Sequence, residues 1–353
     1  MTQRKNMQKK LLKIMAVTAL LALLASISCL SAYGAETKEI RLGYLPTTGH
    51  ALTFMAKEQG FFADQGLDVQ LSQFPNSADG YNALTAGKLD VIAMGSTAPA
   101  VYIAKGNNLK YIGGLMGEGA AAVVKEDRAS ELGRINDFKG KTIATVRMST
   151  GDVVFRNAMH EAGIDWQNDV TIQELKSPSI VMDAVKTGKV DVGIVWLPYQ
   201  QIAESQGLKV VLNSDTFSPE HPCCRFVVSA ATLENDRDSL VKFEAALIQA
   251  YDYIKTNPDE SVKDVQKYVD FDRSIIYDSI FSEHFNFSPD PNKKAIGKWW
   301  EMMNSIGFID SDEDIDEHID TTVYKEALDG LVSKQPDNKN FQELLEAYKK
   351  NNE

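Results

Sequence analysis

The sequence predicts an α/β protein with two similar lobes, on three observations. Strand-like and helix-like segments alternate up to about residue 229, as expected for a mostly parallel sheet with right-handed crossovers. Residues 82–91 recur at 183–192 with the same Ala, Gly, Lys, Asp and Val in equivalent places. In both copies a helical pattern stops at Gly and leads into an apolar strand. Two such lobes in one chain form a cleft, which the carboxyl ends of the parallel strands face.

The individual elements follow from hydrophobic periodicity and from Gly at helix ends. In the first set we expect strands at 38–46, 67–74, 89–94 and 109–116, and helices at 50–66 and 77–88. Pro99, after the small-residue turn 95–98, suits the first turn of a further helix.

The second set begins with a strand at 141–146 and a helix at 149–163, for which Ser149 or Thr150 is the candidate N-cap. It continues with strands at 170–175 and 190–196, a helix at 179–187, and closing segments at 199–207 and 208–212. Beyond residue 229 the pattern is helical, with main helices at 240–255, 259–269 and 293–306.

Composition and charge exclude several classes of protein. The 353 residues are 44% hydrophobic and 24% charged, which excludes disorder, collagen and coiled coil. The net charge is −12, although the first 34 residues hold five basic residues and no acid, so the remainder carries −17. A body this acidic is a poor non-specific binder of nucleic acid. Five His and three Cys leave little material for a metal cluster, and we expect no metal and no cofactor.

The N-terminus is typical of an export signal. A basic start is followed by an apolar run, 14–27, that is short for a membrane-spanning helix. Small residues Ala32 and Gly34 favour cleavage before Ala35 and soluble release. The competing site is a lipobox-like 26–29, in which Ser26 stands where Leu is usual and Cys29 would carry a lipid anchor.

An ordered set of motifs between about residues 40 and 228 resembles the substrate-binding proteins of the nitrate, sulfonate and taurine ABC-transporter family. The motifs are RLGYLP (41–46), AKEQGFF (56–62), GLDV (66–69), GKLDV (87–91), FKGKTIA (138–144) and DVGIVWLP (191–198). The resemblance implies a two-lobed, type II periplasmic-binding fold with the ligand cleft between the lobes. Lobe 1 would comprise 36–119 plus 220–353, including the C-terminal helices, and lobe 2 would comprise 120–219.

The same resemblance implies an exported, periplasmic, monomeric binding protein without catalytic activity. It would capture a small organic anion and deliver it to an inner-membrane permease driven by a cytoplasmic ATPase. The chain contains no GxxxxGK[ST] loop, so the ATPase would be another subunit.

Three turns that end strands and start helices are the candidate ligand site. They contribute Thr47 and His50, then Gly95, Ser96 and Thr97, and finally Ser149, Thr150 and Gly151. Free N–H groups and the positive end of a helix dipole at the last turn suit a sulfonate, carboxylate or nitrate. By itself this turn is more simply a routine N-cap, and the two similar turns shift the balance toward a ligand site.

Aromatic and cationic residues complete the expected site. Tyr44, Trp196 and Tyr199 stand at strand ends and could wall the ligand, although Trp196 could also be a core residue. Arg225 could pair with an oxyanion, and His221 lies beside it where the chain returns to the first lobe. The adjacent Cys223 and Cys224 favour buried small hydrophobes over a redox or metal site, and adjacent Cα atoms are too close for an easy disulfide.

Alternatives concern the ligand and the class of protein. The fold also resembles thiamin-pyrimidine synthases, but residues 223–227 keep only part of their cysteine motif and 96–102 lack their cofactor Lys and His. A binding protein for a thiamin-pyrimidine precursor, with aromatic stacking, is the milder alternative. Two further segments are decoys: 117–122 fits a loose dinucleotide fingerprint but precedes a strand, and 310–321 lacks the Gly and Glu of a calcium loop.

Overall fold

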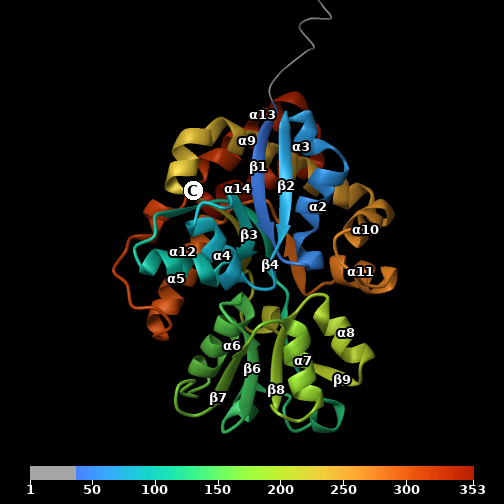
Figure 1. Ribbon diagram of the computed structural model, residues 1–353, viewed down its shortest axis with the longest axis vertical. Coiled ribbons are helices and arrows are strands. Elements are labelled where there is room, and N and C mark those ends of the chain that lie inside the picture. The colour runs from blue at the N-terminus through green and yellow to red at the C-terminus, as the bar shows by residue number, and fades with distance from the viewer. Residues whose placement is uncertain (1–36) are drawn as a thin grey trace, which may run out of the picture. The chain divides into compact units, whose positions relative to one another are not determined.

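The computed structural model describes residues 37–353. The expected signal segment 1–34 and the alternative lipid-attachment residue Cys29 lie outside the described residues. Residues 39–353 form one compact unit, in which two sheets lie one beyond the other (Figure 1). No helix of the described residues is long and apolar enough to cross a membrane.

The first sheet has six strands in the order β11-β4-β10-β3-β1-β2. Strand β1 runs parallel to β3, but β10 is inserted antiparallel between β3 and β4, and β11 is antiparallel to β4. This sheet is therefore mixed where the sequence predicted mostly parallel strands. Its strands are β1 (Lys38–Tyr44), β2 (Leu67–Gln73), β3 (Val91–Gly95), β4 (Leu109–Glu118), β10 (Pro222–Ser229) and β11 (Phe285–Phe287).

The second sheet has five strands in the order β7-β6-β8-β5-β9. Strand β6 is parallel to β7 and β8, whereas β5 is antiparallel to both β8 and β9. Its strands are β5 (Ala120–Lys125), β6 (Thr142–Val146), β7 (Thr171–Leu175), β8 (Val192–Trp196) and β9 (Leu208–Asn213). The segment that fits a dinucleotide fingerprint thus joins two strands, β4 and β5, as the sequence indicated.

Helices cover both faces of each sheet. The alternation of β3 places Val91 and Ala93 in one core cluster and Ile92 and Met94 in another, on opposite faces. The first cluster is covered by α2 (Ala51–Glu58), α3 (Phe61–Asp64), α9 (Ala230–Thr256), α10 (Pro258–Gln266), α11 (Arg273–Ile280), α13 (Thr322–Lys334) and α14 (Lys339–Asn352). The second is covered by α4 (Ser77–Thr85), α5 (Thr97–Ala104) and α12 (Lys293–Ser305).

The second sheet is covered in the same way, by α6 (Thr150–Glu161) on one face and by α7 (Pro178–Lys186) and α8 (Tyr199–Ser205) on the other. We call the first sheet with α2–α5 and α9–α14 lobe 1, and the second sheet with α6–α8 lobe 2. The C-terminal helices pack on lobe 1 (Figure 1). The chain passes between the lobes at Gly119 and again between β9 and β10.

The internal repeat has a structural cause. In lobe 1 the Asp90 carboxylate accepts a hydrogen bond from the Arg41 N–H at 2.8 Å, and the Asp90 N–H donates to the Arg41 carbonyl. In lobe 2 the Asp191 carboxylate accepts from the Thr142 N–H at 2.8 Å, and the Asp191 N–H donates to the Thr142 carbonyl. In each lobe the repeated Asp therefore joins the start of one strand to the neighbouring parallel strand, which accounts for the duplicated motif.

One expected helix is divided. The pattern over 50–66 predicted a single helix, but the structure has a 3-10 turn (Thr48–His50) followed by α2 and α3. Gly60 separates α2 from α3 with φ of +78°, a conformation that L side chains rarely adopt. Strands β10 and β11 were not predicted. The eight residues of β10 lie in the middle of the sheet and are buried with little alternation, and β11 has only three residues.

Candidate functional site

A narrow cavity lies between the lobes, at the ends of strands from both sheets. Its volume is about 30 Å³, which is room for roughly one or two water molecules. Lobe 1 contributes residues after β1, the last residue of β3, residues of β4 and β10, and the first residue of α4. Lobe 2 contributes the ends of β6 and β8, the first residue of β5 and the first turn of α6. The lining residues are Leu45, Thr47, Ser77, Gly95, Met116, Ala120, Val146, Arg147, Ser149, Thr150, Gly151, Trp196, Cys223 and Cys224.

The start of α6 supplies polar groups to this cavity. Ser149 is the N-cap residue, and its hydroxyl accepts a hydrogen bond from the Asp152 N–H at 3.2 Å. Thr150 and Gly151 are the first helical residues, whose N–H groups have no acceptor within the helix. A Cβ on Gly151 would lie 2.9 Å from the Ala120 Cβ, so the helix start packs directly on β5. The positive end of the α6 dipole therefore faces the cavity.

Polar groups of two of the three turns, 95–97 and 149–151, bond to one another across the cleft. The Ser96 N–H donates to the Thr150 hydroxyl at 3.1 Å, and that hydroxyl donates to the Cys223 carbonyl at 3.1 Å. The Thr97 hydroxyl donates to the Ser149 carbonyl at 3.3 Å. These bonds join lobe 1 to the start of α6, which explains why the cavity is so small.

A fourth interlobe bond runs from the Thr47 hydroxyl to the Leu197 carbonyl at 2.6 Å. Leu197 directly follows Trp196, whose partly exposed indole lines the cavity. Tyr199 does not line it; its ring packs edge-on against Trp196 at 6.2 Å between centroids and against Phe271 at 5.7 Å. Tyr199 therefore supports the indole from behind.

Two expected site residues lie in the core of lobe 1. Tyr44 packs against Phe54 and Tyr268, and its hydroxyl donates to Gln73 at 3.4 Å. His50 is fully buried, and its Nδ1 accepts from the Leu45 N–H at 3.3 Å. Burial lowers the pKa of His50 to about 3, so the imidazole is neutral. Neither side chain lines the cavity.

Arg225 and His221 also lie away from the cavity. The Arg225 guanidinium is 4% exposed and donates to the carbonyls of Pro291, Met116 and Cys224, each at 2.9 Å. All three bonds lie inside lobe 1. They hold the guanidinium away from the cleft, where it would not contact a ligand. The structure thus separates both residues from Ser149, Thr150 and Gly151, with which the sequence grouped them.

Several residues that line the cavity were not among the ligand-binding residues that the sequence predicted. Cys223 and Cys224 both reach it, with their sulfurs 3.8 Å apart and unbridged. The contact between the two thiols lowers the pKa of Cys223 and raises that of Cys224. Arg147 is the one charged residue of the lining; it follows β6 directly and lies 3.8 Å from Glu174. The sequence could have indicated Arg147 as a site residue, because it directly follows a strand that ends at the cleft.

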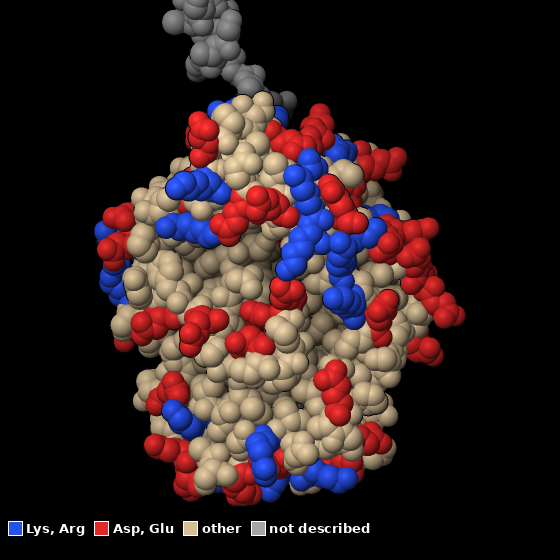
Figure 2. Space-filling view, turned by 180° about the vertical axis from the view of Figure 1, so that it is seen from behind, with Lys and Arg blue, Asp and Glu red and all other residues tan. Residues whose placement is uncertain are grey.

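The cavity offers several kinds of group to a bound molecule. It combines an indole, two thiols and aliphatic side chains with hydroxyls and helix-start N–H groups. Among the described residues, no group of three or more His, Cys, Asp or Glu side chains is placed to hold a metal ion. Charged side chains of both signs are interspersed over the rear face, where much of lobe 2 is uncharged (Figure 2).

Comparisons with known proteins agree with this architecture. The periplasmic nitrate-binding protein of Synechocystis PCC 6803 superimposes with a TM-score of 0.73, at 16% identity, over 84% of this chain and 89% of that one. At 16% identity this similarity establishes the fold alone. This chain has the two-lobed fold of periplasmic binding proteins.

Two relatives are similar in sequence. A Bacillus subtilis (strain 168) protein named "Putative aliphatic sulfonates-binding protein" is 28% identical over 308 residues, which cover 83% of this chain and 89% of the relative. The formylaminopyrimidine-binding protein of Halalkalibacterium halodurans is 23% identical over 239 residues, 64% of this chain and 69% of the relative. The model of the NMT1-like family matches residues 33–268. Since this match spans well over half of the chain, the protein belongs to the NMT1-like family.

Proposed function

We propose that this protein is the extracytoplasmic solute-binding component of an ABC importer and that it captures a small organic anion between its lobes. The observation that carries the proposal is the convergence of three polar turns, one of which is the α6 start, on one interlobe cavity. The names of the related proteins support it, since they include binders of aliphatic sulfonates and nitrate. The expected partners are a membrane permease and its ATPase.

The anion would be held by groups of both lobes. The N–H groups of Thr150 and Gly151 and the dipole of α6 complement sulfonate or nitrate oxygens. Arg147 supplies the positive charge, because Arg225 is committed to backbone carbonyls. Trp196 and the aliphatic lining would contact the organic part of the solute.

Binding of an organic solute requires the lobes to separate first. A cavity of about 30 Å³ holds little more than a water molecule. The turns that would bind the solute instead hydrogen-bond one another. Hinge opening at the two interlobe connections would free the Thr97 and Thr150 hydroxyls, whereas the Ser96 N–H would keep its 2.7 Å bond to the Cys223 carbonyl of the same lobe. Closure around the solute would replace the interlobe bonds with bonds to it.

A formylaminopyrimidine-like heterocycle is the second candidate. It is favoured by the lining itself, which has one cation at its edge and an indole beside two thiols and aliphatic side chains. A related protein binds a formylaminopyrimidine. Stacking on Trp196 would then contribute more than charge.

Calorimetry with purified protein separates the two candidates. The solutes are taurine, a longer alkanesulfonate, nitrate and a formylaminopyrimidine. For an anion we expect micromolar affinity, roughly −8 kcal/mol, and about tenfold weaker binding in Arg147→Ala, the loss of one charge-assisted contact. Arg134→Ala is the matched control, since Arg134 is an exposed lobe 2 arginine paired with Asp137. Binding of the heterocycle alone, unaffected by Arg147→Ala, would overturn the anion assignment.

Export and delivery need separate measurements. N-terminal sequencing of the exported protein should begin near Ala35. A lipidated Cys29 would instead show membrane anchoring. Loss of solute uptake in a host that lacks this protein, restored by the wild type but not by Trp196→Ala, is the result expected of an importer subunit. Unchanged uptake would contradict that role.

A further inference from the structure

Cys223 and Cys224 are adjacent in β10, yet both side chains line the interlobe cavity. In a regular strand, consecutive side chains point to opposite faces of the sheet. Here the pairing of β10 with β4 shifts register on both sides of Cys224, and this irregularity brings the two side chains to the same cavity. Their sulfurs lie 3.8 Å apart and unbridged. The anion binding proposed above gives neither thiol a role.

The two thiols differ in exposure and in acidity. Cys223 is partly exposed, whereas Cys224 is buried. The hydrogen bond from the Cys224 thiol, together with the charge of Arg225, lowers the pKa of Cys223, and the same contact between the thiols raises the pKa of Cys224. The thiolate is the form that attacks a disulfide. Cys223 is therefore the sulfur that reacts first when the lobes separate and a small disulfide reaches the cavity.

The peptide that links the two cysteines is bonded to the other lobe. Its carbonyl, that of Cys223, accepts hydrogen bonds from the Ser96 N–H at 2.7 Å and from the Thr150 hydroxyl at 3.1 Å. The bond from Thr150 joins lobe 1 to the start of α6 in lobe 2. A reaction that turns this peptide therefore acts directly on the contact between the lobes.

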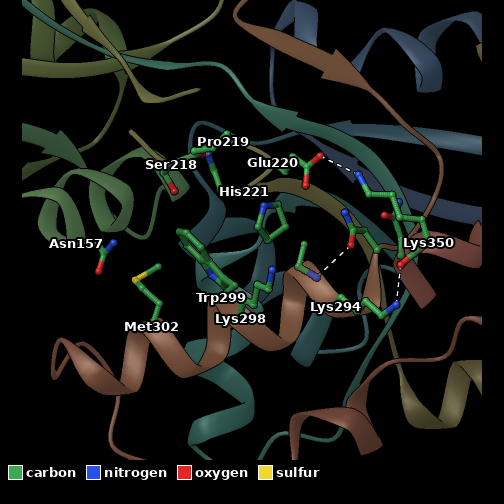
Figure 3. A pocket seen from close by; sticks show the side chains of 14 residues that line it. Asn157, Ser218, Pro219, Glu220, His221, Lys294, Lys298, Trp299, Met302 and Lys350 are labelled. Atoms are coloured by element: carbon green, nitrogen blue, oxygen red, sulfur yellow. Dashed lines mark hydrogen bonds and ion pairs between the residues drawn. The ribbon is translucent and has the colours of Figure 1, made fainter. Parts of the chain in front are cut away.

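A bond between the two sulfurs closes a small ring that contains this peptide. Neighbouring Cα atoms are about 3.8 Å apart across a trans peptide, whereas disulfides prefer about 4.4–6.8 Å, so the ring closes only if the peptide turns. The chain ahead of the pair has room to follow, because Ser218, Pro219 and Glu220 border a cavity of about 280 Å³ beside α12 (Figure 3).

We propose that Cys223 and Cys224 form a reversible redox site, at which an external low-mass disulfide converts the two thiols to a disulfide and so loosens the contact between the lobes. The Cys223 thiolate attacks one sulfur of the external disulfide, forms a mixed disulfide with it and releases a thiolate. The Cys224 thiol gives its proton to that thiolate and attacks the Cys223 sulfur, which releases the second thiol. The cysteines lose two electrons and two protons, and the external disulfide gains them as two thiols.

The new disulfide changes the balance between closed and open lobes. The turned Cys223 carbonyl no longer accepts from the Thr150 hydroxyl, so the open form gains population. A disulfide in so small a ring is more easily reduced than an ordinary structural one, so excess thiol reverses the change. The disulfide itself does not depend on the proposed function, whereas its effect on opening rests on the lobe movement proposed there.

Mass spectrometry of the purified protein after incubation with glutathione disulfide tests the chemical step. Tryptic cleavage after Lys209 and Arg225 releases a peptide, 210–225, that holds Cys223 and Cys224 and no other cysteine. We expect this peptide to lose two hydrogen atoms, to resist alkylation, and to recover both thiols with excess dithiothreitol. A peptide that keeps its two thiols, or that carries glutathione without closing the ring, would overturn the proposal.

Small-angle scattering of the same samples, without solute, tests the effect on the lobes. The oxidised protein should have a larger radius of gyration than the reduced protein. Cys223→Ser, which retains only the buried thiol, should have the same radius with and without glutathione disulfide. Thr150→Val shows separately whether the lobes open when their bond to the Cys223 carbonyl is lost.

The two variants distinguish a failure of this inference from a failure of the proposed function. If Thr150→Val expands and the oxidised wild type does not, the disulfide leaves the interlobe contact intact and the redox inference is wrong. If neither expands, the bond to the Cys223 carbonyl does not hold the lobes together, which contradicts the proposed lobe movement and, with it, the effect of the disulfide. Expansion of Cys223→Ser by glutathione disulfide would show that the oxidant acts elsewhere and would overturn the assignment to this pair.

Discussion

The Thr150 hydroxyl accepts a hydrogen bond from the Ser96 N–H across the cleft, at 3.1 Å. The same hydroxyl donates to the Cys223 carbonyl, so one side chain at the start of α6 holds two lobe 1 strand ends. Both partners lie where a solute would bind. If the proposed function holds, the interlobe contact competes with solute binding for the Thr150 hydroxyl.

The first prediction concerns a variant that lacks the Thr150 hydroxyl. Thr150→Val keeps the β-branched shape but loses both bonds, each contributing about 1 kcal/mol. We expect the balance between closed and open lobes to move toward the open form, with a larger radius of gyration in small-angle scattering without solute. Thr187→Val is the control, since the Thr187 hydroxyl bonds only to carbonyls of the preceding helix α7, those of Asp183 and Ala184. An unchanged radius in Thr150→Val would mean that these bonds do not hold the lobes together.

The contrast between Thr150 and Arg225 shows what the sequence could predict. Turns that end strands and start helices are readable from small residues and periodicity, so Ser96, Ser149 and Thr150 could be expected at the cleft. Arg225 could not be placed, because the pairing of β10 with β4 shifts register on both sides of Cys224. Such an irregularity breaks the alternation of a strand. It allows Cys223 and Cys224 both to reach the cavity while Arg225 points elsewhere.

His50 illustrates a second limit. The turn Thr47–His50 was recognisable, but a single turn of 3-10 helix gives no periodicity from which to tell its buried side. Its imidazole faces the core, while the Thr47 hydroxyl of the same turn reaches across to Leu197. The two-lobed fold, by contrast, was predictable, because the repeated Gly-Lys-aliphatic-Asp-Val motif joins equivalent strand pairs in both lobes.

The second prediction concerns Arg225. Arg225→Met should destabilise the protein by about 3 kcal/mol or more, because three buried carbonyl oxygens lose a charged donor. Arg237→Met is the control; it removes an exposed ion pair with Glu326 and should cost less than about 1 kcal/mol. Urea unfolding measures both. If Arg225→Met were stable but bound the solute more weakly, Arg225 would have to be assigned to the ligand site after all.

The third prediction is a loss of stability in acid that depends on His50. Its pKa is about 3 in the folded protein against the ordinary 6.5, so between these values the unfolded chain binds a proton that the folded one does not. Stability therefore falls as the pH drops below 6.5. At pH 4.5 the contribution of His50 to this loss is about 2.5 kcal/mol.

Urea unfolding at pH 7 and pH 4.5 measures this loss. In His50→Asn, whose side-chain oxygen can accept the Leu45 N–H in place of Nδ1, the loss between the two pH values should be smaller by that amount. His160→Gln, at an exposed position on α6, should lose as much as the wild type. Equal losses in all three proteins would contradict the assignment to His50.

The last prediction concerns Glu244, a fully buried side chain of α9 whose carboxyl oxygens have no hydrogen-bond partner among the described residues. Burial raises its pKa well above the ordinary 4.5, so the folded protein keeps the carboxyl protonated while the unfolded chain releases the proton. This difference removes stability as the pH rises, by about 1.4 kcal/mol per unit below the raised pKa. Glu244→Met should therefore stabilise the protein, and by more at pH 7 than at pH 5, in urea unfolding. Glu234→Met, at an exposed position on the same helix, should change stability little at either pH. If Glu244→Met were destabilising at both pH values, the carboxyl would have to be paired with buried water, and its removal would cost a hydrogen bond where we expect a gain.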